Sequence, residues 1–274
     1  MSVARPGPLA DWEGRRVEEW RRSWGLPQLL VYAAATSTND LARELAAGGA
    51  PAGATVLADH QTRGRGQRGR SWVAPAGQAV LLSMVLRPGA GAADTVPSVL
   101  PVRVGLVVAR ALEELTGLAV GLKWPNDVVV NGCKVGGILC EGVMTGGGFH
   151  GVAGIGLNVL QQPEDFPPGL DPPAASLRML GAAQAERALV AGAIARAVAS
   201  LGDDAARLLD EAELREYAGR DILRGRRVTV DGVPAGTAEG LAPDGALLVA
   251  GAGGTIHIRS GTVRPDSRLQ GATS

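Results

Sequence analysis

The chain has 274 residues, of which 46% are hydrophobic and 20% charged, and its 27 basic side chains balance its 27 acidic ones. That composition is typical of a globular protein and is too apolar for a disordered chain. The formal net charge of zero excludes a protein that coats a polyanion through bulk charge. The length predicts one or two domains with a substantial core.

The cysteines and the N-terminus bear on the cellular compartment. Cys133 and Cys140 are the only cysteines, and their spacing fits neither a metal knuckle nor a C-x-x-C redox pair. The first 14 residues contain Arg5, Pro6 and Pro8 where a signal peptide needs an apolar stretch. No run approaches the ~20 apolar residues of a membrane span. We therefore expect a cytoplasmic protein.

Hydrophobic periodicity predicts the elements in chain order. Residues 11–24 carry three tryptophans at roughly helical spacing, which predicts one amphipathic helix in an N-terminal extension of residues 1–30. A helix, two buried strands and a long helix follow, and we expect Arg103 and Arg110 of the long helix to face solvent. These four elements span residues 39–47, 55–58, 79–86 and 99–115.

A series of strands and two Ala-rich helices complete the predicted catalytic domain, residues 31–219. The strands span 118–124, 128–130, 135–143 and 150–159, with an Asn131-Gly132 turn and a loop at 146–148; the helices span 182–201 and 203–217. After a boundary near Arg220, short strands at 227–230, 235–241, 246–249 and 256–259 alternate with Asp-Gly turns. This pattern predicts a small β barrel over residues 220–274.

A Gly-Arg segment at residues 60–72 is the strongest anomaly, with the sequence HQTRGRGQRGRSW. Glycines let backbone N–H groups approach an anion, and guanidinium groups supply paired donors, so the segment suits a phosphate or carboxylate clamp. It is not a Walker loop, because the Lys-Ser/Thr ending is missing. Alone, it could equally be a solvated basic loop or one that touches RNA.

Four further motifs share this region, and each also has a purely structural explanation. STND at 37–40 can cap a helix, and KWPND at 123–127 can be a sheet bulge. KVGGILCE at 134–141 and GIGLN at 154–158 place glycines inside apolar strands, which favours close approach of a ligand or a bulge.

Taken together in this order, the five motifs resemble the biotin protein ligase family. The resemblance runs from about Tyr32 to Asn158, and the C-terminal β unit matches the family's SH3-like domain in size and position. It implies an α+β fold: a mixed-sheet catalytic domain of the biotin/lipoate protein ligase type, like that of class II aminoacyl-tRNA synthetases, followed by an SH3-like barrel.

The resemblance also implies a reaction and its partners. The family joins biotin to ATP, which gives biotinyl-5′-AMP and pyrophosphate, and transfers the biotinyl group to a lysine of a biotin carboxyl carrier protein. Mg²⁺ would come mainly through the ATP phosphates, with Asp127 as a candidate ligand. Only ~30 residues precede Tyr32, too few for a helix-turn-helix domain, so we expect a monofunctional ligase without a DNA or membrane partner, as a monomer or homodimer.

Site roles follow from the resemblance, position by position. Arg65 and Lys134 would hold the biotin carboxylate and α-phosphate, Lys134 would stabilise the transition state, and Gly137 and Ile138 would wall the biotin pocket. The implied catalytic residues are Lys134, Arg65 and Arg68. The implied biotin-binding residues are Ser37, Thr38, Asn39, Gln61, Arg65, Gly66, Gln67, Lys134, Gly137 and Gly154. The implied ATP-binding residues are Arg68, Arg70, Trp72, Lys123, Asn126, Asp127, Gly156 and Asn158.

Two hypotheses concern the Gly-Arg segment. The mixed anhydride must be kept from water, which predicts that residues 62–72 order over the ligand. The family carries an arginine at the position of Gln67, which predicts a leakier adenylate unless Arg68 takes over. The alternatives are a lipoate or octanoate protein ligase or transferase of the same fold, and a non-enzymatic nucleic-acid-binding protein. The latter is disfavoured because few aromatic residues are available for stacking.

Overall fold

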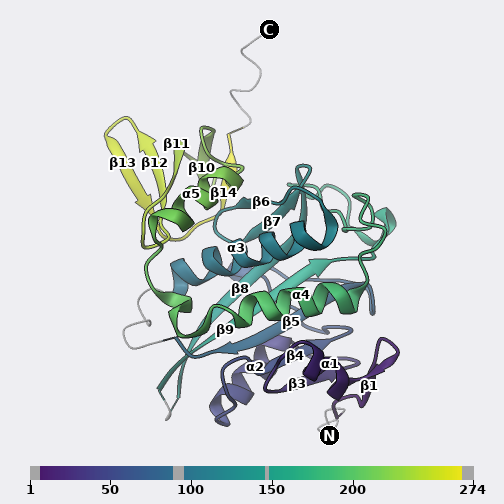
Figure 1. Ribbon diagram of the computed structural model, residues 1–274. Helices are drawn as coiled ribbons and strands as arrows, with labels where there is room; N and C mark the ends of the chain where they lie inside the picture. The colour runs from purple at the N-terminus through teal and green to yellow at the C-terminus, as the bar shows by residue number, and fades with distance from the viewer. Residues whose placement is uncertain (1–6, 89–95, 146–147, 267–274) are drawn as a thin grey trace, which may run out of the picture.

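A seven-stranded mixed sheet forms the centre of the molecule (Figure 1). The computed structural model describes residues 7–88, 96–145 and 148–266. The strand order is β3-β4-β5-β9-β8-β7-β6; β3 and β4 are parallel and the other neighbours antiparallel. The strands are β3 (Leu29–Tyr32), β4 (Thr55–Ala58), β5 (Ala79–Leu86), β6 (Gly121–Lys123), β7 (Asp127–Val130), β8 (Cys133–Thr145) and β9 (Gly148–Asn158).

The strands predicted for this region are confirmed within a few residues, whereas β3 was not predicted. The four residues of β3 are buried or half-buried, and so short an apolar run carries no readable period. The predicted Asn131-Gly132 turn is confirmed, because both residues have positive φ (50° and 77°) between antiparallel β7 and β8. Of the predicted loop at 146–148, residues 146–147 lie outside the described residues.

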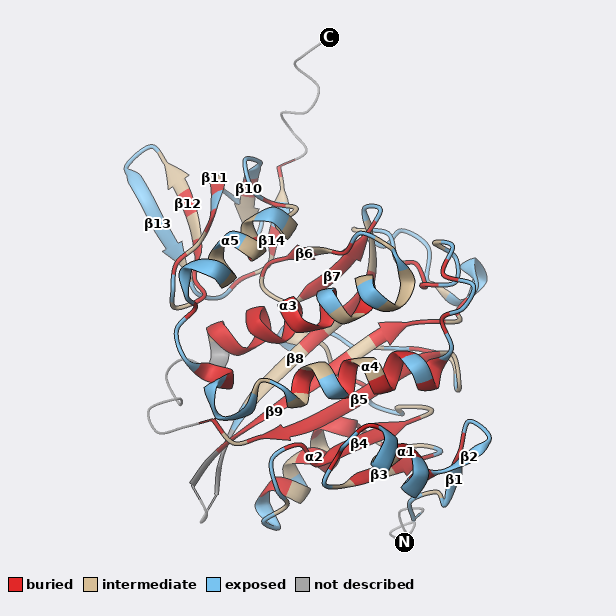
Figure 2. Cartoon of the chain, viewed as in Figure 1, coloured by how far each residue is buried: buried red, intermediate tan, exposed pale blue. Residues whose placement is uncertain are grey.

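Helices cover both faces of this sheet. Helices α3 (Val96–Thr116) and α4 (Arg187–Ala199) lie side by side across one face, and α2 (Thr38–Ala47) packs on the other (Figure 1). Alternate residues of β4 point to the two faces of the sheet. Leu57 packs into the larger core cluster, and Val56 and Ala58 pack against α2 on the opposite face. Every residue of β4 and β5 is accordingly buried, and Figure 2 shows β5 in the colour of buried residues.

The two predicted Ala-rich helices were only partly right. The first begins at Arg187 rather than at residue 182, and the second divides into a 3-10 turn (Gly202–Ala206) and helix α5 (Glu211–Arg220). The division has a local cause. Asp210 caps α5 by accepting a hydrogen bond from the Glu213 N–H, and the Glu213 side chain accepts one from the Asp210 N–H in return.

The expectation that Arg103 faces solvent was wrong. Arg103 is 3% exposed and donates to Glu213 of α5 and to the backbone carbonyls of Asp204 and Leu208. A buried guanidinium is tolerated only with such a full set of acceptors, and these come from segments about 100 residues away. Arg110, in contrast, is exposed and pairs with Glu216.

The N-terminal segment is not one helix. Strands β1 (Asp11–Trp12) and β2 (Arg15–Arg16) form a hairpin, and only Val17–Ser23 (α1) is helical. The turn residues Glu13 and Gly14 have φ of 46° and 74°, a conformation that ends a regular helix.

The three tryptophans fasten this segment to the catalytic sheet. Trp12, Trp20 and Trp24 are buried with ring centroids 5.6–6.5 Å apart, and the Trp12 indole N–H donates to Asp59 at 2.9 Å. Arg187 of α4 pairs with the same carboxylate and lies over the Trp12 ring. The N-terminal segment therefore shares the main core.

The C-terminal part is a five-stranded antiparallel sheet in the order β13-β12-β11-β10-β14. Its strands are β10 (Arg227–Val230), β11 (Val233–Leu241), β12 (Leu247–Gly251), β13 (Gly254–Ile258) and β14 (Val263–Pro265). The four predicted strands are confirmed, β14 was not predicted, and closure of a barrel is not seen, since β13 and β14 remain separate edges. Trp124 donates its indole N–H to the buried Gly245 carbonyl at 2.9 Å, which joins this sheet to the catalytic part.

No helix among the described residues combines the length and apolar character that a membrane crossing requires.

Candidate active site

An open cleft of about 890 Å³ lies at the junction of α2, the Gly-Arg segment, strands β7 to β9 and the C-terminal sheet. Small-molecule sites typically lie in concave clefts that carry a few convergent polar groups. The cleft brings together nearly all of the residues that the resemblance implied. Those lining it are Ser37, Thr38, Asn39, Gln61, Arg65, Gly66, Gln67, Arg68, Arg70, Trp72, Lys123, Asn126, Asp127, Lys134, Gly137, Ile138, Gly154 and Gly156.

Asn158 is the one predicted site residue that the structure does not bring to the cleft. It is 5% exposed, donates to the Ala175 carbonyl at 3.2 Å and accepts from Gln161 at 2.9 Å. These bonds tie the end of β9 to the segment that follows it.

Glycines of the paired strands β8 and β9 form the floor of the cleft, with Gly137 opposite Gly156 and Leu139 opposite Gly154. A Cβ on Gly154 would lie 2.1 Å from Asn39 Oδ1, and one on Gly156 would lie 2.7 Å from the Trp72 ring. Any larger residue would therefore push a cleft side chain aside. Both glycines admit a close neighbour, which is the role expected of glycine inside a strand.

Asn39 is the centre of a buried polar network at the start of α2. Its side-chain N–H groups donate to Glu141 at 2.7 Å and to the Leu139 carbonyl at 3.2 Å, and Ser83 Oγ lies 2.6 Å from its Oδ1. Gln61 accepts from the Thr38 N–H at 2.7 Å, which satisfies one of the free N–H groups of the helix start. The network fixes these side chains before any ligand is bound.

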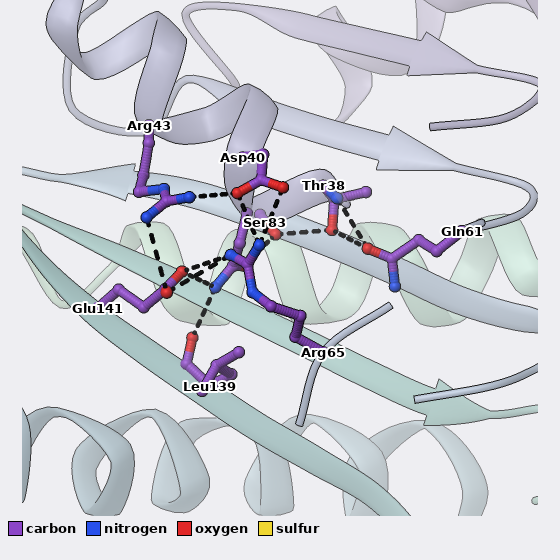
Figure 3. Close-up of polar contacts among 9 residues, drawn as sticks. Thr38, Asp40, Arg43, Gln61, Arg65, Ser83, Leu139 and Glu141 are labelled. Atoms are coloured by element: carbon purple, nitrogen blue, oxygen red, sulfur yellow. Dashed lines mark hydrogen bonds and ion pairs between the residues drawn. The ribbon is translucent and has the colours of Figure 1, made fainter. Parts of the chain in front are cut away.

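Arg65 lies between two carboxylates (Figure 3). Its guanidinium donates to Asp40 at 2.8 and 2.9 Å and lies 3.3 Å from Glu141. Burial on its own would lower the pKa of Arg65, but the Asp40 hydrogen bonds and the Glu141 charge outweigh it and the net shift is upward. Arg65 is therefore a fixed cation at the cleft wall.

Lys123 and Lys134 are the only lysines in the sequence, and both face Asp127. Lys134 Nζ lies 2.5 Å from one carboxylate oxygen and Lys123 Nζ lies 3.5 Å from the other. Desolvation lowers the pKa of Lys123, although the Asp127 charge partly offsets this effect. The Asp127 carboxylate holds both ammonium groups in place. The two lysines thus concentrate positive charge at one end of the cleft.

These pairs bear on the prediction that Asp127 binds a metal. Both of its carboxylate oxygens face ammonium groups, and the described residues contain no group of three His, Cys, Asp or Glu side chains that could hold a metal ion. The side chains of this region do not by themselves fit a protein-held metal. Asp127 as a metal ligand stays a prediction.

The Gly-Arg segment, which lines the cleft, folds back on itself. The Gly66 N–H donates to the Arg70 carbonyl at 2.7 Å, and the Trp72 N–H donates to the Gly64 carbonyl at 3.0 Å. Arg68, at the tip, has a φ of 57°. The Trp72 ring lies with its centroid 6.0 Å from Lys134 Nζ, and its buried Nε1 has no hydrogen-bond partner among the described residues.

Sequence reasoning missed two groups of residues at this site. Asp40 and Glu141 belong to the quoted motifs, so the sequence held a signal, but their role appears only when Arg65 is seen between them. The second group, Gly261, Thr262 and Val263, lines the cleft from the C-terminal sheet. It lies about 100 residues beyond the last motif and has no local signature.

Comparison with known proteins agrees with this geometry. The model of the biotin/lipoate A/B protein ligase family matches residues 31–158. The biotin–[acetyl-CoA-carboxylase] ligase of Mycobacterium tuberculosis is 34% identical over 269 residues, which cover 86% of this chain and 91% of that protein. The chain belongs to the biotin protein ligase family.

Other biotin protein ligases differ in how much of them this chain covers. The bifunctional ligase/repressor BirA of Bacillus subtilis is 36% identical over 190 residues, and the chain spans only 56% of its length. A biotin protein ligase from Aquifex aeolicus, solved in complex with biotin and ATP, superposes with a TM-score of 0.70 at 26% identity. That alignment covers 88% of this chain and all of the Aquifex chain.

Proposed function

We propose that this biotin protein ligase activates biotin with ATP as biotinyl-5′-AMP and then transfers the biotinyl group to a lysine of a biotin carboxyl carrier domain. The observation that carries the proposal is the placement of Lys134 and Arg65 on one cleft, above a glycine floor. We place the reaction in the cytoplasm, because the two thiols suit a reducing compartment.

In the first step a biotin carboxylate oxygen bonds to the α-phosphorus of ATP, and the bond to pyrophosphate breaks. Both reactants are anionic, so the site must supply positive charge where they meet. Lys134 and Arg65 supply it, and Asp127 holds Lys134 at 2.5 Å in a fixed orientation. Mg²⁺ enters as part of the Mg-ATP substrate.

In the second step the amine of the carrier lysine attacks the acyl carbon of the mixed anhydride. AMP leaves with the bonding electron pair, and the amine loses a proton as the amide forms. Water would compete for the same carbon. We infer that the Gly-Arg segment shields the mixed anhydride from water. The polar side chains of Thr38, Asn39 and Gln61 line the cleft, and we infer that they face the polar biotin ring.

The test is release of pyrophosphate from Mg-ATP, measured with and without biotin and with an added biotin carrier domain. We expect biotin-dependent release that falls by orders of magnitude in Lys134→Ala and recovers partly in Lys134→Arg. Arg215→Ala is the matched control, because Arg215 is 72% exposed and, within the described part of the chain, pairs only with Glu211 of its own helix.

The acid that supports pyrophosphate release distinguishes the ligase proposal from its alternatives. Release that depends on lipoate or octanoate but not on biotin would move the chain to that branch of the family. No release with any of the three acids, together with salt-sensitive RNA binding, would refute the ligase proposal.

A further inference from the structure

The tip of the Gly-Arg segment is bound by the C-terminal sheet. The Arg68 guanidinium pairs with the carboxylate of Asp231, and the Arg70 guanidinium donates to Thr262 Oγ1 at 2.7 Å. These partners lie 163 and 192 residues apart in the sequence. The segment therefore lines the cleft between the catalytic sheet, which holds Arg65, and the C-terminal sheet, which holds Arg68 and Arg70.

The two acceptors form a preorganised pair. Asp231 Oδ1 accepts the Thr262 N–H at 2.9 Å, and the Asp231 N–H donates to the Thr262 carbonyl at 2.9 Å. Asp231 sits in the turn between β10 and β11 with a φ of 51°, a conformation that Asp adopts more readily than most residues. Both acceptors thus hold their positions through each other, without help from the arginines.

The C-terminal sheet is itself fixed against the cleft. The Trp124 indole binds the Gly245 carbonyl in a buried contact, and a Cβ on Gly245 would lie 2.6 Å from the Ser98 carbonyl oxygen. The base of the Gly-Arg segment is fixed too, because Arg65 is held by Asp40 and Glu141. Only the tip, with Arg68 and Arg70, depends on the C-terminal contacts.

The strength of these contacts suits an element that must open and close. Arg68 and Asp231 are 47% and 49% exposed, so the pair is screened by solvent and weak. Substrates must enter the cleft and product must leave it, whereas the mixed anhydride must be shielded between the two steps. A weak contact at the tip permits both.

We propose that Asp231 and Thr262 are positioning residues that hold the Gly-Arg segment closed over the cleft, so that the C-terminal sheet helps to retain the activated acyl-adenylate. The role of these residues in retention rests on the proposed function. The contacts between the segment and the C-terminal sheet do not rest on it.

The test uses the full chain with Asp231→Asn and Thr262→Val, both nearly isosteric. Asp244→Asn is the matched control: Asp244 also lies in an Asp-Gly turn, caps a backbone N–H (Ala246, 3.1 Å) and pairs with an arginine, but that partner is Arg259 of the same sheet. Two rates are measured: tryptic cleavage within residues 63–70 of the ligand-free protein, and release of preformed biotinyl-5′-AMP after rapid gel filtration.

We expect Asp231→Asn to raise both rates about two- to fivefold, the range for an exposed ion pair. Thr262→Val should act in the same direction with a smaller effect, and Asp244→Asn should match the wild type. Unchanged melting temperatures separate this positioning role from a general loss of structure. Rates equal to wild type in both Asp231→Asn and Thr262→Val, or an equal rise in Asp244→Asn, would overturn the proposal.

Failure of the ligase function gives a different result. In that case no variant, nor the wild type, forms an adenylate, while the cleavage rates still decide whether Asp231 and Thr262 hold the segment.

Discussion

Gly154→Ala should damage the site by displacing Asn39. The added Cβ would lie 2.1 Å from Asn39 Oδ1 and 2.9–3.0 Å from the other carboxamide atoms. Asn39 is 4% exposed and is held by Ser83, Leu139 and Glu141, so it has no free space to enter. Because the clash involves a buried and bonded group, it must be relieved by moving Asn39 or the strand.

The magnitude follows from two contributions. Overpacking of a tight interior costs about 1–3 kcal/mol, and each hydrogen bond lost by Asn39 adds about 1 kcal/mol. The free energy of unfolding should therefore fall by roughly 2–4 kcal/mol, which corresponds to a Tm lower by roughly 4–16 °C. Biotin binding should weaken in parallel, because Asn39 lines the cleft.

The assay is a double-mutant cycle of Gly154→Ala with Asn39→Ala, followed by urea unfolding and by biotin calorimetry. If the clash with the carboxamide is the cause, the double variant loses less stability than the sum of the single variants, by about 1–3 kcal/mol. Gly151→Ala is the control in the same strand, since its Cβ would come no nearer than 3.4 Å to any neighbour (Leu100 Cδ2), which is ordinary van der Waals contact. Additive single effects, or a loss in Gly151→Ala as large as in Gly154→Ala, would refute the reasoning.

Three further predictions concern pH, Asn158 and the loop. Burial raises the pKa of Asp221 to about 6, although the Leu223 N–H hydrogen bond opposes it. The folded state therefore binds this proton more tightly than the unfolded chain, and the free energy of unfolding should fall by up to about 3 kcal/mol as pH rises from about 4 to about 6. Asp221→Asn should flatten that slope in urea titrations at several pH values, and an unchanged slope would assign it to other groups. Asn158→Ala should lower the free energy of unfolding by about 1–3 kcal/mol, because the Gln161 side chain loses its hydrogen-bond acceptor. The KM for ATP should not change. A raised KM in a variant of full stability would instead favour direct contact between Asn158 and the nucleotide. Gln67→Arg should slow release of biotinyl-5′-AMP if the missing arginine makes this site leaky, and equal release from both proteins would dismiss that idea.

The motifs carried enough information to identify most of the cleft. STND, the Gly-Arg segment, KWPND and the glycine-rich strands all contribute residues to one cleft. Glycines at 154 and 156 leave room where another residue would collide with Asn39 or Trp72. A glycine inside an apolar strand is visible in the sequence, whereas the side chains that it accommodates come from distant segments. Asn158 belonged to the same motif, but its burial against Gln161 could not be read from it.

The remaining features depended on contacts between distant segments. The sequence by itself determined most strands, the Asn131-Gly132 turn and the positions of the charged site residues, because periodicity and turn chemistry act over a few neighbours. Only the tertiary structure decided that Arg103 is buried, since its acceptors lie about 100 residues away, and that Trp12 of the tryptophan cluster packs against Arg187 and binds Asp59. It likewise brought Asp231 onto Arg68, because a salt bridge between residues 163 positions apart is set by how two sheets pack and leaves no pattern in either segment.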